Sequence, residues 1–183
     1  MVRDILMRKT KSIRPEKFYD NMAPYYDDFI KETRLPSCSL EAEKVFLESV
    51  LGDAERIIDL GCGTGRSMKL LADGKRELTG VDLSPGMIAL AKTQGLNALQ
   101  ASAFRLPFPD GAFDAAYSLH MGFGYCRTHG QMTNLANEIY RVLRTGGRVL
   151  LDSPHALKKG RRFTPSSCSS PPFVVFVSSF TGP

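Results

Sequence analysis

An apolar run that ends in a glycine-rich turn, Arg56–Gly65, constrains the fold of this chain more than any other stretch. Three branched apolar residues flank Asp59 in this run, and a glycine then occupies every second position. Such a pattern predicts a buried parallel strand that stops at a tight loop. Because glycine has no Cβ atom, the loop can adopt positive φ and bring its backbone against a ligand. Residues 66–73 continue with helical periodicity, which completes the opening of a nucleotide-type βαβ unit.

The spacing of the glycines bears on the ligand. A dinucleotide-binding loop has the spacing G-x-G-x-x-G and holds a pyrophosphate at a helix N-terminus, whereas residues 61–65 have G-x-G-x-G, which excludes a nicotinamide-dependent dehydrogenase. Asp59 precedes the first glycine by two residues, where a carboxylate favours a cationic or hydroxyl-rich ligand; alternatively, it only orders the loop by accepting from backbone N–H groups. The next expected strand, 77–82, ends in Asp82, and an acid there can accept both hydroxyls of a ribose.

Two segments, DLGCGTG at 59–65 and TGVDLSPGMI at 79–88, resemble the class I S-adenosylmethionine-dependent methyltransferases that act on small molecules. The resemblance extends over about residues 18–152. It implies an α/β fold, with a Rossmann-like, doubly wound and mostly parallel sheet. It also implies S-adenosylmethionine as the cofactor and a small-molecule methyl acceptor, with Gly61 and its neighbours near the amino-acid part of the cofactor and Asp82 at its ribose. The cofactor-binding residues expected from it are Tyr26, Asp59, Gly61, Cys62, Gly63, Asp82, Leu83, Met87, Ser102, Ala103, Phe104 and Leu119.

Aromatic and acidic residues repeat at a spacing of seven in the segment 18–27. The segment matches the family pattern Y-D-x-x-A-x-x-Y-D, which implies a lid over the cofactor with Tyr26 near its methionine end. Alternatively, the segment is an amphipathic turn that packs its aromatic side chains against the sheet. The basic residues before it, 1–17, show little periodicity and predict a flexible arm or a frayed helix.

No fixed catalytic pair is visible in the sequence. Methyl transfer from a sulfonium is an in-line displacement, which depends mainly on alignment of the reactants. His120, which follows the expected fourth strand, and Tyr26 are the candidates for a base, although a lone histidine at this place is more often part of the cavity wall. Ser102 departs from the family, which has an aspartate there that accepts from the adenine amino group; a hydroxyl is a weaker acceptor, and the backbone N–H of Ala103 or Phe104 is an alternative.

The remaining elements follow from periodicity and from capping residues. Ser84 is expected to cap the helix that starts at Pro85 and stops at Gly95. A helix at 40–51, capped by Ser39 or a neighbour, is expected to bury a stripe of apolar residues, and a helix at 134–143 is expected to stop at the turn 144–147. The apolar stripe of the helix at 40–51 comprises Leu40, Val45, Phe46, Val50 and Leu51. The further strands are expected at 99–104, 113–119 and 148–152.

The periodic pattern stops near Asp152, whereas the family continues with a hairpin of a sixth and a seventh strand. The chain therefore resembles a member of the family that is truncated at its C-terminus and lacks a normal hairpin. Residues 156–183 are first basic and then rich in serine and proline, which predicts a disordered or non-native tail in which only 173–177 can form a strand. The expected organisation is a basic arm at 1–17, a methyltransferase domain at 18–155 and this tail. A degenerate protein that binds the cofactor weakly and does not turn over is the alternative function.

The net charge of +5 lies in the two ends of the chain. Residues 1–17 carry +4, residues 156–183 carry another +4, and the residues between them carry −3. This distribution argues against a nucleic-acid-binding face on the folded domain. The four cysteines have no C-x-x-C spacing, so no metal site is expected. Since no apolar stretch has the length of a signal peptide or a membrane span, a cytoplasmic protein is expected.

Overall fold

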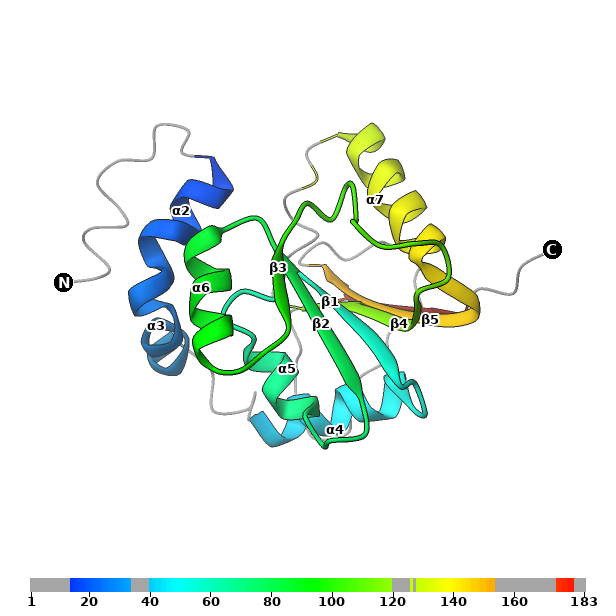
Figure 1. The fold of residues 1–183 in the computed structure, drawn as a ribbon, viewed down its shortest axis with the longest axis horizontal. Helices are drawn as coiled ribbons and strands as arrows, with labels where there is room; N and C mark the ends of the chain where they lie inside the picture. The colour runs from blue at the N-terminus through cyan, green and yellow to red at the C-terminus, as the bar shows by residue number, and fades with distance from the viewer. Residues whose placement is uncertain (1–13, 34–39, 120–125, 127, 154–173, 180–183) are drawn as a thin grey trace.

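The computed structural model describes residues 14–33, 40–119, 126, 128–153 and 174–179, and all structural statements below concern these residues. They form a six-stranded sheet with the order β3-β2-β1-β4-β5-β6, covered by helices on both faces (Figure 1). The strands are β1 (Arg56–Leu60), β2 (Glu77–Asp82), β3 (Ala98–Gln100), β4 (Phe113–Ser118), β5 (Leu143–Ser153) and β6 (Val174–Ser179). The helices are α2 (Pro15–Met22), η1 (Ala23–Tyr25), α3 (Tyr26–Thr33), α4 (Leu40–Leu51), α5 (Arg66–Leu71), α6 (Pro85–Thr93) and α7 (His129–Val142).

Strands β1 to β5 are parallel, and the order reverses between β1 and β4. The expected α/β, Rossmann-like and doubly wound fold is therefore confirmed. Alternation of side chains along the strands divides the core between the two faces. Ile58 on β1 packs with the apolar side of α7, whereas its neighbour Ile57 packs with Leu47 and Leu51 of α4 on the opposite face.

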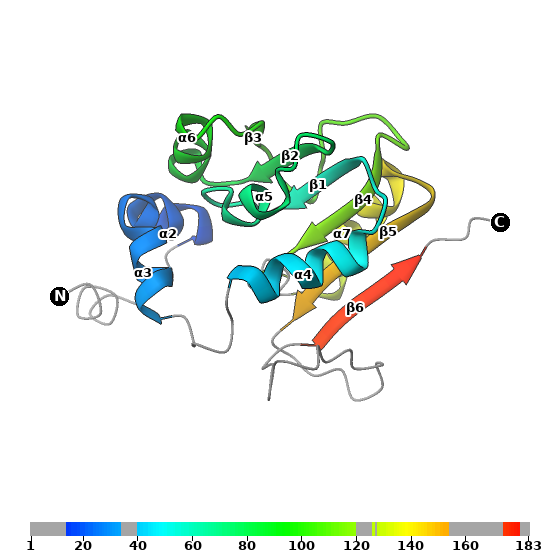
Figure 2. The same ribbon diagram turned by 90° about the horizontal axis from the view of Figure 1, so that it is seen from below.

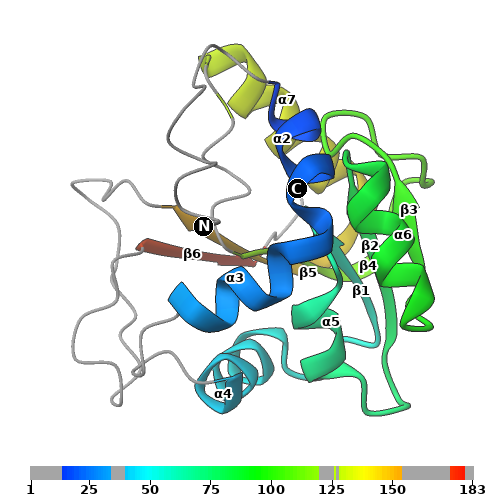
Figure 3. The same ribbon diagram turned by 90° about the vertical axis from the view of Figure 1, so that its left-hand side faces the viewer.

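A ligand crevice is expected where the strand order reverses, outside the carboxyl ends of the parallel strands. In Figure 2 the arrows of β1 and β4 point towards the side of the molecule on which α2 and α3 lie. Helices α2 and η1 pack against α6, and Figure 3 shows α2 beside α6 from that side, with α3 further from it. We call residues 15–33, which comprise these three helices, the lid segment. Helix α2 begins at Pro15, within the last residues of the expected basic arm, and proline is suited to the first position of a helix.

Three expectations for the helices and the third strand need correction. In α4, Phe46, Val50 and Leu51 pack in the core as expected, whereas Leu40 and Val45 are exposed and Leu47 is buried. Helix α7 begins at His129 rather than 134, because Thr128 and Gln131 form a capping box. Strand β3 begins one residue early and ends at Gln100, which leaves 101–104 in a turn.

The fifth strand also begins earlier than expected. Residues 144–147, expected as the turn that ends a helix, belong to β5, and the register with β4 shifts between the pairs Phe113–Leu143 and Ala115–Arg148. Gly146 has a φ of 77° within this irregular stretch. Glycine tolerates this conformation, so the chain can pass from α7 into β5 without a separate loop.

Beyond β5, β6 pairs antiparallel with residues 148–153 and forms an edge of the sheet. In the described part of the tail, the sheet therefore gains one strand. Strand β6 overlaps 173–177, the one stretch of the tail expected to be able to form a strand, and it ends two residues later. The rest of the tail lies outside the described residues. Without β6, the backbone groups of β5 would form the sheet edge, and exposed edges promote aggregation.

Limited proteolysis of the full chain checks the boundary of the domain. We expect the first cuts between 154 and 173, because serine- and proline-rich segments seldom form a protected core. The fragment that retains 14–153 is expected to persist longer than any other. Resistance of 154–183 equal to that of β1 and β4 would contradict this boundary.

Candidate cofactor-binding and active site

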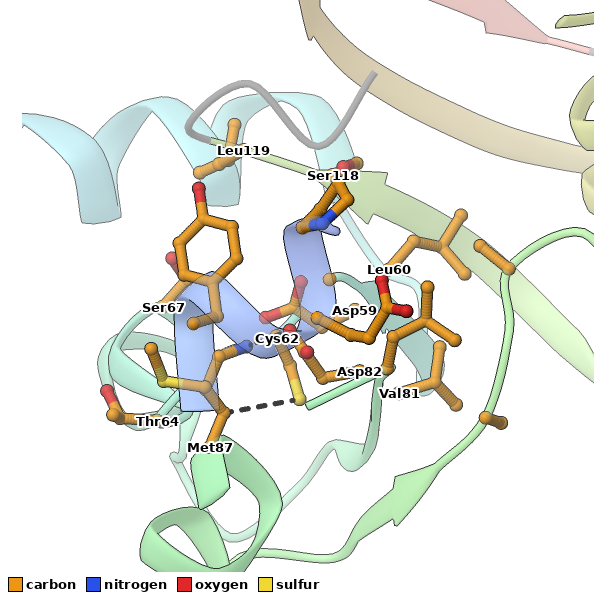
Figure 4. A pocket seen from close by; sticks show the side chains of 18 of the residues that line it. Asp59, Leu60, Cys62, Thr64, Ser67, Val81, Asp82, Met87, Ser118 and Leu119 are labelled. Carbon is orange, nitrogen blue, oxygen red and sulfur yellow. Dashed lines mark hydrogen bonds between the residues drawn. The ribbon is translucent and has the colours of Figure 1, made fainter. Parts of the chain in front are cut away.

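A cavity of about 460 Å³ lies at the carboxyl ends of β1, β2 and β4. The loop 61–64 and the ends of these strands line the cavity, and Arg14, Tyr19 and Tyr26 line it as well. Figure 4 shows the side chains of Asp59 and Asp82 close together in the middle of the cavity, with Ser118 and Leu119 beyond them. Two carboxylates thus lie at the ends of adjacent strands in one cavity.

Asp59 is a buried carboxyl group in the cavity wall, and the residue is only 4% exposed. Burial raises its pKa to about 8, and the negative charges of Asp82 and Glu43 act in the same direction. The Tyr117 hydroxyl and the Arg66 guanidinium oppose this pKa shift without cancelling it. A carboxyl group that is costly to ionise when alone is well suited to pair with a cation in the cavity.

The alternative role of Asp59, ordering the loop through backbone N–H groups, is not supported by the geometry. The N–H groups of Gly61 and Cys62 donate to the carbonyl oxygen of Val81, at 2.8 and 3.0 Å. The N–H of Gly63 donates to Asp82 instead. The carboxyl group of Asp59 is therefore not the acceptor that holds the turn of the glycine loop.

Asp82 joins the two loops that border the cavity. Its Oδ2 accepts from the N–H of Gly63 at 3.0 Å, and its Oδ1 accepts from the N–H of Ser84 at 2.8 Å. Burial raises the pKa of Asp82, while these two backbone hydrogen bonds act against the rise. Each carboxylate oxygen has a second lone pair, so both oxygens can accept a further hydrogen bond from a ligand.

The glycines of the loop have two different roles. Gly61 and Gly65 have φ values of 78° and 80°, which side-chain-bearing residues seldom adopt. No other atom lies within 4 Å of where a Cβ of Gly61 would be, so its backbone faces open space. A Cβ at Gly65 would collide with Leu96. Gly61 therefore leaves room for a ligand, and Gly65 allows the start of α5 to lie close to Leu96 in the loop after α6.

Comparison with known proteins bears on this arrangement. A sequence family described as a methyltransferase domain matches residues 57–147. The demethylmenaquinone methyltransferase of Thermus thermophilus is 40% identical over 109 residues, covering 55% of this chain and 48% of that protein. The mouse protein named "Probable tRNA methyltransferase 9B" is 28% identical over 145 residues, covering 79% of this chain and 30% of that protein. The chain thus spans about half of the first relative's length and less of the second's.

One solved structure that this chain resembles contains the demethylated form of the cofactor. The geranyl diphosphate C-methyltransferase of Streptomyces coelicolor, a complex with Mg²⁺, geranyl diphosphate and S-adenosyl-L-homocysteine, matches with a TM-score of 0.54 and 25% identity. The match covers 61% of this chain and 44% of that chain. The chain belongs to the class I S-adenosylmethionine-dependent methyltransferase family.

The cofactor of this methyltransferase family, S-adenosylmethionine, carries a sulfonium, an ammonium and a ribose diol. The residues of the cavity fit these groups. Asp59 is a buried carboxyl group without a nearby cation strong enough to restore its ordinary pKa, and both oxygens of Asp82 retain acceptor capacity for a diol. The open space at Gly61 admits a ligand against the backbone. Among the described residues, no group of three or more metal-binding side chains is found.

Most of the expected cofactor-binding residues line this cavity. They are Tyr26, Asp59, Gly61, Cys62, Gly63, Asp82, Leu83, Met87, Ala103, Phe104 and Leu119. Burial raises the pKa of the Cys62 thiol far above its ordinary value, so this cysteine is an uncharged part of the wall. His120 lies outside the described residues.

Ser102 does not line the cavity, contrary to expectation. Its Oγ accepts from the N–H of Phe104 at 3.2 Å, and its carbonyl oxygen accepts from the N–H of Arg105. The side chain therefore closes the turn after β3, because the strand ends before it reaches this residue. Ala101, Ala103 and Phe104 line the cavity from this turn.

We expect Ser102→Asp to tighten binding of S-adenosylhomocysteine by about fivefold. The carboxylate reaches one bond further than the hydroxyl, so one of its oxygens can close the turn while the other accepts from the ligand. Ser102→Asn is the matched control, since its amide has the same reach without the charge. Titration calorimetry of both variants provides the comparison. Weaker binding by a folded Ser102→Asp protein, or an equal gain from Ser102→Asn, would contradict the expectation.

Several further residues that line the cavity are not predicted from the sequence. Ser118 ends β4, and its position could have been found from the rule that ligands lie at the carboxyl ends of parallel strands. Thr64 and Arg66 lie within or next to the glycine loop. Gln131 and Leu135 come from α7, and the sequence has no local signal that directs this helix to the cavity.

Proposed function

We propose that this chain binds S-adenosylmethionine in the cavity at β1, β2 and β4 and transfers its methyl group to a small-molecule acceptor. The observation that carries the proposal is a pair of carboxyl groups, the buried Asp59 of β1 and the half-buried Asp82 of β2, beside a glycine loop that leaves open space at Gly61. Asp59 would pair with the cationic end of the cofactor, and Asp82 would accept from its ribose hydroxyls.

When bound, the cofactor supplies an electrophilic methyl group on a positively charged sulfur. The chain's own contribution is to orient the reactants and to exclude water. Correct alignment of reactants can contribute about 7–11 kcal/mol to catalysis, which agrees with the absence of a fixed acid–base pair among the described residues of the cavity. Tyr26 remains a candidate for a group that contacts the acceptor, together with His120.

Two observations favour a small acceptor over a nucleic acid. Apolar side chains, including Phe104, Leu119 and Leu151, line the cavity. The residues between the basic ends of the chain carry a net charge of −3, whereas nucleic-acid binding depends on a basic surface. The name of the Thermus thermophilus relative indicates a small acceptor and that of the mouse relative indicates tRNA, so the experiment must include both.

Titration calorimetry with S-adenosylmethionine, S-adenosylhomocysteine and NADH tests the cofactor assignment. We expect binding of the first two and none of NADH. Transfer of a labelled methyl group into a small-molecule extract and into total tRNA then tests the acceptor class. Labelling of tRNA alone would overturn the small-molecule assignment, and binding of NADH alone would overturn the whole proposal.

Binding without turnover is the second candidate function. The observation that favours it is Ser102, which stands where the family has an adenine-binding aspartate and whose hydroxyl is occupied in the turn. Weak binding of S-adenosylhomocysteine without transfer of label to any acceptor pool would support this alternative.

A further inference from the structure

The lid segment contains two Tyr-Asp pairs, Tyr19-Asp20 and Tyr26-Asp27, whose side chains have different surroundings. Both tyrosines line the cavity. Their rings meet edge to face with a centroid separation of 6.0 Å, and Tyr26 lies 4.0 Å from where a Cβ of Gly63 would be. The tyrosines thus lie over the cavity and its glycine loop, and the aspartates next to them form separate hydrogen bonds.

Asp20 binds the N-terminus of α6. Its Oδ1 accepts from the hydroxyl of Ser84 at 2.5 Å and from the N–H of Gly86 at 3.0 Å. These two donors lower the pKa of Asp20, the Ser84 hydroxyl most strongly. Gly86 favours this approach, since a Cβ there would lie 3.2 Å from the Cβ of Ala23 and 3.3 Å from Asp20, closer than ordinary van der Waals contact.

Asp27 binds the glycine loop. Its Oδ1 accepts from the hydroxyl of Thr64 at 2.7 Å. Thr64 is buried, and its carbonyl oxygen also accepts from the side chain of Gln94 at 3.2 Å, so it is fixed from two sides. The aspartates of the two Tyr-Asp pairs, Asp20 and Asp27, therefore bind to the two loops that border the cavity.

These contacts form a closed path through Asp82. From Asp20 the path runs to Ser84, whose N–H donates to Asp82. Asp82 in turn accepts from Gly63, which adjoins Thr64, and Thr64 donates to Asp27. The carboxylate expected at the ribose is thus connected on both sides to the lid segment.

We propose that Asp20 and Asp27 are positioning residues that hold Tyr19 and Tyr26 over the cavity and link their placement to the loops around Asp82. The part of this proposal that concerns cofactor binding rests on the proposed function. Order in either loop favours order in the lid segment, and a ligand that fixes Asp82 also fixes both tyrosines. The acids of the two Tyr-Asp pairs therefore act through the tyrosines and the loops, without touching the ligand themselves.

Asp28 provides a matched control. It follows Asp27 directly in α3, and its exposed side chain pairs with Lys31, one turn away, at 3.1 Å. Asp28→Ala thus removes a carboxylate from the same helix without removing a hydrogen bond to either loop. Asp20→Asn and Asp27→Asn are conservative variants, because an amide oxygen can accept the same hydrogen bonds.

Hydrogen exchange and ligand binding are measured on the full chain. In the ligand-free protein, Asp20→Ala and Asp27→Ala are expected to speed amide exchange in 15–33 by about tenfold while exchange in β1 and β4 stays unchanged. Both are also expected to weaken S-adenosylhomocysteine binding by about tenfold and to lose the protection that this ligand gives to 15–33. Asp28→Ala should match the wild type, and the Asn variants should recover most of the effect.

A double-mutant cycle at Asp27 and Thr64 keeps the proposal testable if Asp20→Ala does not fold. Thr64→Val removes the hydroxyl that donates to Asp27, so Asp27→Ala should weaken binding little further when Thr64→Val is already present. Additive losses would overturn the link through this hydrogen bond. Unchanged exchange in 15–33 for both Ala variants would overturn the positioning role alone. Failure of the wild type to bind S-adenosylhomocysteine would instead overturn the proposed function and the linkage to ligand, with the exchange result still reporting on the lid segment.

Discussion

Asp82→Ala is expected to weaken binding of S-adenosylmethionine by at least about 100-fold. Two charge-assisted hydrogen bonds to the ribose would be lost, each of roughly 1.5–3 kcal/mol. The variant also removes the acceptor that joins the N–H groups of Gly63 and Ser84, so the two loops that border the cavity lose a common attachment. Titration calorimetry with the cofactor and with S-adenosylhomocysteine measures the loss.

The control for Asp82→Ala must separate an effect at the cavity from a general loss of stability. Asp73 offers this separation, because its Oδ1 accepts from the N–H groups of Lys75 and Arg76, at 2.9 and 3.1 Å, in a turn that does not line the cavity. Asp73→Ala should lower stability without changing the dissociation constant. A dissociation constant for Asp82→Ala equal to that of the wild type would remove Asp82 from the binding site.

Local patterns in the sequence are enough to predict the central part of the fold. The apolar run around Asp59, the glycines after it and the cap at Ser84 each specify structure within a few residues. β1 and α6 consequently begin where the sequence indicates. Parallel strands also bring their carboxyl ends to one edge, so Asp59 and Asp82 could be expected in one cavity.

Other parts depend on contacts that no local pattern contains. Asp20 and Ser84 are 64 residues apart in the sequence, and the pairing of their side chains follows from the packing of α2 on α6. The sequence predicts Ser102 in the cavity only if the third strand continues as far as residue 104. Strand β3 ends at Gln100, and a difference of a few residues in a strand end decides which way a side chain points. In α4, the position of the sheet determines that Leu47 is buried while Leu40 and Val45 are exposed.

Asp59→Asn is expected to raise the free energy of unfolding of the ligand-free protein and to weaken its binding of S-adenosylmethionine. The pKa of Asp59 is about 8 in the folded protein, against about 3.9 for an aspartate in an unfolded chain. Between these values the folded protein binds one more proton than the unfolded chain, so the contribution of Asp59 lowers the free energy of unfolding as pH rises from about 4 to about 8. The neutral amide of the Asp59→Asn variant avoids this loss.

The measurement compares wild type and Asp59→Asn by denaturant unfolding at several pH values. At pH 8 we expect the variant to be more stable by roughly 2 kcal/mol, since one pKa unit corresponds to about 1.4 kcal/mol and relaxation reduces the full effect. Near pH 4 the difference should vanish, because the carboxyl group is then protonated in the folded protein. S-adenosylmethionine should bind the variant at least about tenfold more weakly, as the cation loses its buried partner. If Asp59 served mainly to order the glycine loop, the variant would be less stable at every pH, and the two curves would not converge.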